Sequence, residues 1–357
     1  INVKSVWQAY LDQAAADRHY DLEIRLNQPV SEERISLVIP TIPGIEKIEA
    51  WNFTPAALVR PDSLDIVRTY PDGGHGSFTL RSVQPETQLI ATPLLDGRWL
   101  QAGDTNAVVL NQNAKALFPT TKVGDEIQLM IEGKVATFRV VGVIRQILSP
   151  SAAYVTPAAF AEATGQPVQS INAIRFVMKE HDAQTLASVT KGIERTFAAE
   201  NISVKIAISE SLLGEAISGH VYIFIFALIL ISAVMAVVGA LGLMSSMGTS
   251  VIERTREFGI MRAIGARSKT ILRNVISEGV FIGLMSWVIA LPLSIPLTYG
   301  IGYLVGYMSF RAPLPLTVSL PGLIIWLSVI IVGSIAASAY PARQASQLTI
   351  RETLAYI

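Results

Sequence analysis

The chain has 357 residues, with 28 basic and 28 acidic side chains, no cysteine, and 51% hydrophobic residues. A zero net charge argues against a dedicated nucleic-acid-binding protein, because such proteins are usually basic. The absence of cysteine excludes disulfides, thiolate zinc sites and cysteine nucleophiles, and the charged fraction of 16% is well below the ~25% of an average soluble domain.

The neutral total is the sum of two unlike halves. Residues 1–218 hold 19 basic and 24 acidic side chains, a net charge of −5, whereas residues 219–357 hold 9 basic and 4 acidic side chains, a net charge of +5. This division argues against an ordinary soluble protein, and we expect one domain in each half.

The first half alternates between helix and strand patterns, which predicts an α+β domain. Helix patterns occur at residues 3–15, 31–39, 111–118 and 182–199, and Thr156–Pro157 gives a further helix start signal. Strand patterns occur at residues 21–26, 45–59, 64–70, 77–83, 106–110, 124–132, 135–144, 173–178 and 202–208. Gly133–Lys134 predicts a hairpin turn. We expect a small β-rich subdomain, at about 85–165, inserted into an outer α/β unit.

This half contains no pattern that predicts an enzyme. The motifs GxSxG, HExxH and GxxxxGK are absent from the sequence, and the four histidines share no metal-ligand spacing (His19, His75, His181 and His220). The run Gly73–Gly76 is more simply interpreted as a turn between strands than as a site. The carboxylate pairs Asp62/Asp65 and Glu32/Glu33 are better explained as solvated surface charge. We therefore expect no catalytic residue, no metal site and no cofactor.

The second half contains three stretches of 37, 32 and 31 residues without a charged side chain. A membrane-spanning helix needs about 20 mainly apolar residues, so each stretch is long enough for one span. We expect these spans at 221–247, 279–307 and 320–340. Pro292 and Pro296 predict a bend in the middle span, because proline removes a backbone donor.

The loops between the spans predict the orientation. Six basic residues lie within 251–273, whereas the loop at 309–319 holds only Arg311. The positive-inside rule therefore places 251–273 and the C-terminus in the cytoplasm. With three spans, residues 1–218 then lie on the opposite, extracytoplasmic side of the membrane. An exported domain of this size needs a signal or a preceding span, so we expect a fragment of a longer protein with a span just upstream of Ile1.

The loop 251–273 combines an amphipathic helix with a sharp turn. Apolar residues between Ile260 and Ile264 lie beside several arginines. Gly265 can end this helix in the left-handed conformation, and Ser268 can cap the helix that follows. Topology or binding to anionic lipid explains the arginines but not the glutamates and glycines between them. A helix that docks in a groove of another protein is compatible with all of these residues.

The sequence of this loop resembles a known family. The stretch ERTREFGIMRAIGA, from Glu253 to Ala266, is similar to the cytoplasmic signature of FtsX-like ABC transporter permeases. These include the MacB and LolC/LolE types and are also called type VII or mechanotransmission systems. Phe258 stands where an aliphatic residue is more usual in that signature.

The end of the chain resembles the same family. The run YPARQAS, which begins at Tyr340, and the run IRETL, which begins at Ile350, are similar to the closing motif of these permeases. Ile350 and Thr353 depart from that motif. The resemblance covers the whole chain and implies a MacB-like periplasmic core domain followed by three of the four spans of an FtsX-like permease.

The resemblance also implies a partner and a docking site. The permease would perform no chemistry itself, and a separate ATPase subunit would hydrolyse ATP. The parent would be a four-span permease or a duplicated one, and the stretch 29–51 is more similar to the duplicated type. The helix that docks on the ATPase would comprise Glu253, Arg254, Thr255, Arg256, Glu257, Phe258, Gly259, Met261, Arg262, Ala263, Ile264, Gly265 and Ala266.

Two permease units would pair within the membrane lipid. The GxxxG spacings of Gly279/Gly283 and Gly302/Gly306 would allow close approach of helices. The implied function is to couple ATP hydrolysis to movement of the outside domain, for export of a substrate or its extraction from the membrane or outer leaflet. The alternative is a membrane-anchored signalling or scaffold protein that activates an extracytoplasmic protein partner, such as a cell-wall hydrolase.

Overall fold

The computed structural model describes residues 2–59, 78–311, 313–314 and 316–347. These residues form two compact units, one built mainly on residues 8–218 and the other mainly on residues 219–302 and 316–347. The strand predicted at 64–70, the turn Gly73–Gly76, Asp62, Asp65 and the final motif from Ile350 all lie outside the described residues.

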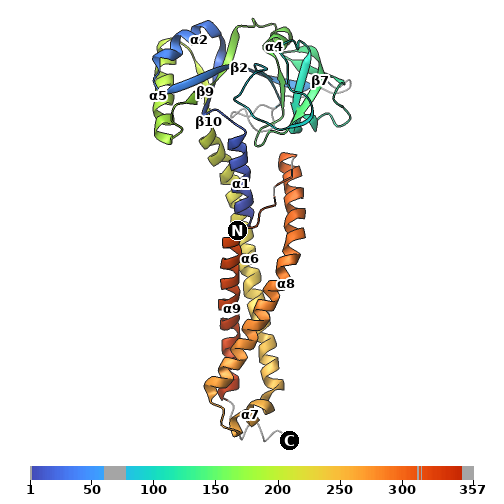
Figure 1. Ribbon diagram of the computed structural model, residues 1–357, viewed down its shortest axis with the longest axis vertical. Helices are drawn as coiled ribbons and strands as arrows, with labels where there is room; N and C mark the ends of the chain where they lie inside the picture. Colours follow the sequence, from blue (N-terminus) through green and yellow to red (C-terminus); the bar gives the residue numbers. More distant parts are fainter. Residues whose placement is uncertain (1, 60–77, 312, 315, 348–357) are drawn as a thin grey trace. The chain divides into compact units, whose positions relative to one another are not determined.

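The first unit is an α+β domain built on one mixed sheet (Figure 1). Its strands are β1 Leu22–Ser31, β2 Ile45–Leu58, β3 Thr79–Ser82, β4 Leu94–Gly97, β5 Ala107–Asn111, β6 Glu126–Ile131, β7 Lys134–Ile144, β8 Ala152–Val155, β9 Ser170–Met178 and β10 Val204–Ser209. Its helical elements are α1 Asn2–Ala16, which begins in the second unit, α2 Glu32–Val38, the 3-10 helix Ile39–Thr41, α3 Gln112–Lys115, α4 Pro157–Thr164 and α5 Ala183–Ala199.

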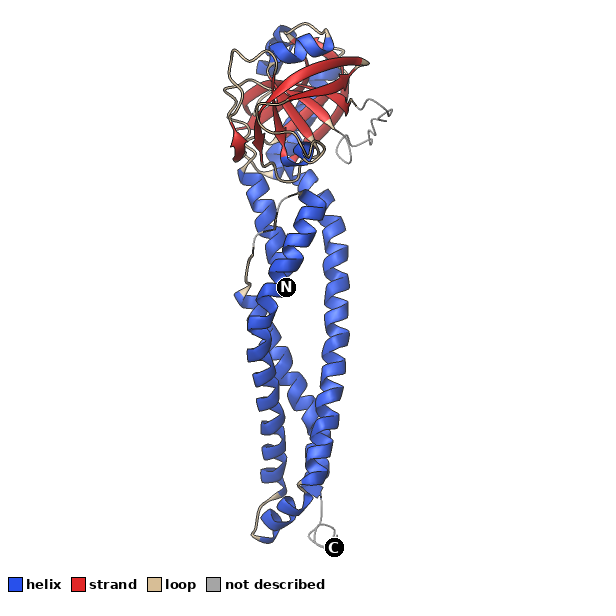
Figure 2. Cartoon of the chain, turned by 90° about the vertical axis from the view of Figure 1, so that its right-hand side faces the viewer, coloured by secondary structure: helices blue, strands red, loops and turns tan. Residues whose placement is uncertain are grey.

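The strands follow the order β10-β1-β9-β2-β3-β8-β5-β7-β4, and β6 pairs with both β2 and β7. The pairs β3/β8 and β5/β7 are parallel, and the other pairs are antiparallel. The long strand β2 connects the two ends of the sheet, since its residues 45–51 pair with β9 and its residues 52–55 pair with β3. Figure 2 shows the strands gathered in this unit.

Each end of the sheet has its own apolar core. In one core, Ile35 of α2 and Phe197 of α5 pack with Ile24 of β1 and Phe176 of β9. In the other, strands β3 and β5 to β8 pack with α4, around residues such as Phe160. Both cores consist of fully buried side chains, and such burial is the main favourable contribution to folding.

Local start signals predicted the first turns of these helices correctly, although α3 ends at Lys115 rather than at Phe118. Ser31, Asn111, Thr156 and Asp182 occupy the N-caps of α2, α3, α4 and α5, and each side chain accepts a hydrogen bond from a backbone N–H of the first turn. Gly165 ends α4 with a φ of 76°, a conformation that glycine adopts without steric cost.

Some predictions for this half were wrong in detail. The hairpin turn is Glu132–Gly133 rather than Gly133–Lys134, because both Glu132 and Gly133 have positive φ, as a two-residue type I′ turn requires. The short strands β4 and β8 were not predicted. All four residues of β4 are exposed and all four of β8 are buried, so neither strand has an alternating pattern.

The second unit contains three long helices that can span a membrane (Figure 1). They are α6 Glu210–Glu253, α8 Ser268–Phe310 and α9 Leu320–Gln347. Each contains the apolar segment of one predicted span, and all three are long and apolar enough to cross a membrane. α8 remains one helix through Pro292 and Pro296, and Figure 1 shows that it is bent rather than straight.

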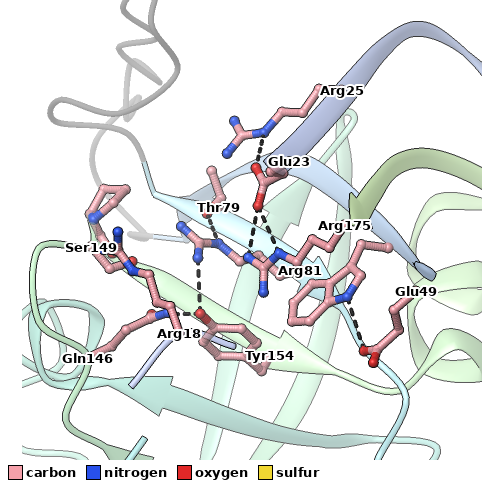
Figure 3. Close-up of polar contacts among 12 residues, drawn as sticks. Arg18, Glu23, Arg25, Glu49, Thr79, Arg81, Gln146, Ser149, Tyr154 and Arg175 are labelled. Carbon is pink, nitrogen blue, oxygen red and sulfur yellow. Dashed lines mark hydrogen bonds and ion pairs between the residues drawn. The ribbon is translucent and has the colours of Figure 1, made fainter. Parts of the chain in front are cut away.

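A buried ion pair connects strands of the sheet in the first unit (Figure 3). Glu23 of β1 accepts hydrogen bonds of 2.8 Å from Nε of Arg25 and 2.9 Å from Nε of Arg175 on β9. The Arg175 guanidinium lies 3.6 Å from the centre of a Trp51 ring. Burial alone would raise the pKa of Glu23, but the charges of Arg25, Arg175 and Arg81 outweigh burial and lower its pKa to about 2.

Arg81 extends this network towards the other end of the sheet. It donates hydrogen bonds to the hydroxyls of Thr79 and Tyr154, and Tyr154 donates to the Gln146 side chain at 2.6 Å. These bonds connect β1 with β9 and β3 with β8, and the charge of Arg81 acts on Glu23 between the two pairs of strands.

We predict that Glu23→Gln destabilises the first unit by about 3–5 kcal/mol, since it leaves buried arginines without their carboxylate. The free energy of unfolding should also fall by about 3 kcal/mol in the unmodified chain as the pH drops from 4.5 towards 2. In that range the unfolded state binds a proton that the folded Glu23 does not bind.

Urea unfolding of the detergent-solubilised chain, followed by tryptophan fluorescence, measures both effects. The matched control is Glu126→Gln, because Glu126 lies in an exposed pair 3.8 Å from Arg139 and should change stability by less than about 0.5 kcal/mol. A Glu23→Gln variant as stable as this control would contradict the stabilising role given to the buried Glu23 carboxylate.

Candidate functional site

The segment that resembles the family signature folds as a short helix between two long ones. α7 Thr255–Ala263 follows α6 after a break at a single residue, Arg254. At its other end, Gly265 has a φ of 99°. The N–H groups of Gly265 and Ala266 donate to the carbonyls of Arg262 and Met261, which is a Schellman motif. The predicted left-handed end at Gly265 is confirmed.

Ser268 does not act as the predicted helix cap. It is the first residue of α8, and its hydroxyl accepts a hydrogen bond of 2.7 Å from Arg262. The side chain is therefore used to hold the end of α7. Sequence alone could not show this, because the arginine that competes for the hydroxyl belongs to another helix.

One face of α7 is packed against the ends of all three long helices. Phe258 is only 4% exposed and lies in an apolar cluster with partners from each helix. The cluster contains Met247 and Val251 of α6, Ile271 and Val275 of α8, and Ala342 and Ala345 of α9. Because four helices share one small core, the position of α7 is tied to the positions of α6, α8 and α9 at this end.

Polar contacts hold both ends of α7. At its start, Arg254 donates to Glu257 at 2.8 Å and to Glu278 of α8 at 3.0 Å. At its end, Arg262 donates to Ser268 and to the backbone carbonyl of Ser346 in α9. The hydrogen bond to Glu257 is the largest cause that raises the pKa of Arg254, so the guanidinium remains charged at any physiological pH.

The opposite face of α7 is exposed and mixes apolar with charged residues. Ile260 is 51% exposed and Ile264 is 80% exposed, and as residues four apart on one helix they lie next to each other. The other exposed residues around them are Glu253, Arg256, Glu257 and Ala263. Exposed isoleucines rimmed by charges are typical of surfaces that bind another protein.

The structure divides the predicted docking residues into two groups. Glu253, Arg256, Glu257, Ala263 and Ile264 are exposed and available to a partner. The remaining residues pack inward, bond within the site or form its turns, namely Arg254, Thr255, Phe258, Gly259, Met261, Arg262, Gly265 and Ala266. Ile260 was absent from the predicted set, although its spacing of four from Arg256 and Ile264 could have identified it.

Two of the four predicted packing glycines contact another helix of the same chain. A Cβ atom at Gly279 would overlap the Ser338 hydroxyl, and one at Gly283 would overlap the Ser334 hydroxyl, both on α9. These glycines therefore allow α8 and α9 to approach closely within one chain. For Gly302 and Gly306, a role in pairing two permease units stays a prediction.

The described residues contain no group of three or more histidines and carboxylates that could hold a metal ion. The exposed side chains of α7 are of the kinds found in protein-binding surfaces, with apolar groups for burial and both signs of charge for orientation.

Comparison with known proteins gives two family models that together cover most of the chain. The MacB-like periplasmic core domain matches residues 6–200, and the FtsX-like permease C-terminal domain matches residues 208–350. The first match alone covers more than half of the chain, and the second contains the whole of α7.

Individual relatives agree with these families. An uncharacterized ABC transporter permease of Methanocaldococcus jannaschii is 29% identical over 221 residues, which are 60% of this chain and 54% of that protein. The macrolide export ATP-binding/permease protein MacB of Agrobacterium fabrum is 26% identical over 285 residues, which are 77% of this chain and 40% of that protein. The chain thus spans about half, or less, of the length of these relatives.

Among solved structures, the periplasmic region of MacB from Actinobacillus actinomycetemcomitans matches with 15% identity and a TM-score of 0.37. The match covers 59% of this chain and 98% of that one.

We predict that Gly279→Ala destabilises the helical unit by about 1–3 kcal/mol, because the added methyl group forces α8 and α9 apart. Gly300→Ala is the matched control on the same helix, since a Cβ there meets nothing within 4 Å. Thermal unfolding in detergent should give a lower Tm for Gly279→Ala and an unchanged or higher Tm for Gly300→Ala. Equal Tm values for the two variants would contradict the close packing of α8 against α9 at Gly279.

Proposed function

Because the chain belongs to the FtsX-like, MacB-type family of ABC transporter permeases, we propose that it couples ATP hydrolysis to movement of its extracytoplasmic domain. An ATPase would dock on the exposed face of α7, and α6, α8 and α9 would carry the resulting movement through the membrane. The movement would serve export of a substrate or its extraction from the membrane.

The observation that carries this proposal is the two-sided character of α7. Its inner face is fixed in the apolar cluster around Phe258, while its outer face leaves Ile260 and Ile264 exposed. A force applied to the outer face therefore acts on the ends of three long helices at once. An amphipathic helix that only lay on lipid would not need its other face packed in a protein core.

The ATPase would be supplied from outside these 357 residues, since the sequence contains no GxxxxGK phosphate-binding loop. We propose a separate ATPase subunit. The relative in Agrobacterium fabrum is named as an ATP-binding and permease protein in one, so an ATPase domain joined to the permease is the other arrangement. In both arrangements, the ATPase would bind the exposed face of α7.

We propose that α7 and the C-terminus lie in the cytoplasm and that the unit built on residues 8–218 lies outside. The positive-inside rule supports this orientation, because Arg256, Arg267, Lys269 and Arg273 cluster near α7. The apolar surface of the long helices would be covered by lipid and by a second permease unit. Gly279 and Gly283 already contact α9, so that second unit would meet other surfaces.

We expect Ile260→Glu and Ile264→Glu each to weaken binding of the ATPase about tenfold or more, since each places a charge in a surface that becomes buried. The measurement is a pull-down of the separately expressed ATPase by the membrane-inserted chain. Leu37→Glu is the matched control, because Leu37 is an equally exposed apolar residue, 72% exposed, in the outer unit.

Retention of the ATPase by both isoleucine variants at the level of Leu37→Glu would refute docking on this face. If the unmodified chain captures no ATPase of this class at all, a membrane-anchored scaffold would be the better description of the protein.

A further inference from the structure

The connection between α6 and α7 is a joint of one residue. Arg254 has φ −101° and ψ 16°, and it separates the last residue of α6 from the first residue of α7. Backbone hydrogen bonds flank this break, from the N–H of Arg254 to the carbonyl of Ser250 and from the N–H of Phe258 to the carbonyl of Arg254. Side-chain contacts at the break add to these bonds and contribute to the angle between the two helices.

The side chain of Arg254 makes several of those contacts, and the Thr255 hydroxyl donates to the carbonyls of Val251 and Ile252. Its Nε donates to Glu257 on α7 and its Nη1 donates to Glu278 on α8, while its guanidinium carbon lies 5.7 Å from the centre of the Phe258 ring. One guanidinium thus connects the joint with the first turn of α7 and with α8. Its partner on α8, Glu278, is 24 positions away in the sequence.

These ion pairs are poorly suited to stabilising the fold. The side chains of Arg254, Glu257 and Glu278 are 44%, 61% and 39% exposed, and ion pairs this exposed contribute little to stability. The fold at this end is held instead by the apolar cluster. The contact of Arg254 with Glu278 adds a connection between the joint and α8 beside that cluster.

We infer that Glu278 is a positioning residue for force transmission, which acts through Arg254 to keep α7 at a fixed angle to α6 and α8. This inference rests on the proposed function. The other end of α7 is already held by Arg262, which bonds to Ser268 and to Ser346 of α9. With both ends held, displacement of α7 moves the three long helices together. Without Glu278, the start of α7 loses this polar connection to α8 and part of the displacement is lost.

The inference separates docking from transmission. Glu278 lies on α8, outside α7 and outside the segment that resembles the family signature, so its substitution leaves the exposed face with Ile260 and Ile264 unchanged. The expected defect is an ATPase that binds and hydrolyses ATP while the outer unit responds less.

The test uses the full chain in membranes together with its ATPase. Because the chain has no cysteine, Leu37→Cys on α2 provides one labelling site for an environment-sensitive fluorophore in the outer unit. Three quantities are measured in each variant: retention of the ATPase, the rate of ATP hydrolysis, and the ATP-dependent fluorescence change.

In Glu278→Gln we expect ATPase retention at the unmodified level and a fluorescence change per ATP hydrolysed that is smaller by roughly two- to fivefold. Glu278→Asp, which keeps the charge, should recover most of the signal. Ser277→Ala is the matched control, because the Ser277 hydroxyl donates only to Asn274 of its own helix, and it should leave the signal unchanged.

Each other outcome has a distinct meaning. A full signal in Glu278→Gln, or equal loss in Glu278→Gln and Glu278→Asp, overturns the inference and leaves the proposed function standing. Loss of ATPase retention in Glu278→Gln overturns it as well, because Glu278 would then belong to docking. If the unmodified chain neither retains the ATPase nor gives an ATP-dependent signal, the proposed function itself fails.

Discussion

The apolar cluster beneath α7 is the contact on which the rest of the site depends. Spanning helices in lipid gain little by associating, because lipid tails are as apolar as their side chains. The small core around Phe258 lies where the ends of the three long helices meet α7. It fastens four helices together where a force from a partner would be applied, and it leaves the outer face of α7 available.

The outer unit is held together by two apolar cores and a buried polar network. Two apolar cores lie at the two ends of one sheet, and the buried network of Glu23, Arg175 and Arg81 ties the strands between them. Breaking such a network by removing one member costs far more than an exposed ion pair does. Such an arrangement opposes slippage of one strand past another within the domain.

Local features of the sequence predicted much of this fold, and distant contacts escaped prediction. The spans, the N-caps Ser31 and Thr156 and the left-handed Gly265 are each set by neighbouring residues. The pairing of Glu23 with Arg175 joins positions 152 residues apart, and the partners of Gly279 and Gly283 are two serines on α9 that carry no motif. The inner and outer faces of α7 likewise depend on where three separate helices end. The family signature therefore pointed to α7 as the candidate site but could not separate its exposed residues from its packed ones.

The most direct test of the account is site-specific cross-linking from α7 to the ATPase in intact membranes. The chain contains no cysteine, so a thiol-reactive cross-linker acts only at an introduced site. Ile264→Cys, on the exposed face, should give a cross-linked product with the mass of chain plus ATPase, whereas Met261→Cys, which packs against the inner cluster, should give none. A product from Met261→Cys alone, or no product from Ile264→Cys while the ATPase remains bound, would contradict docking on the exposed face of α7.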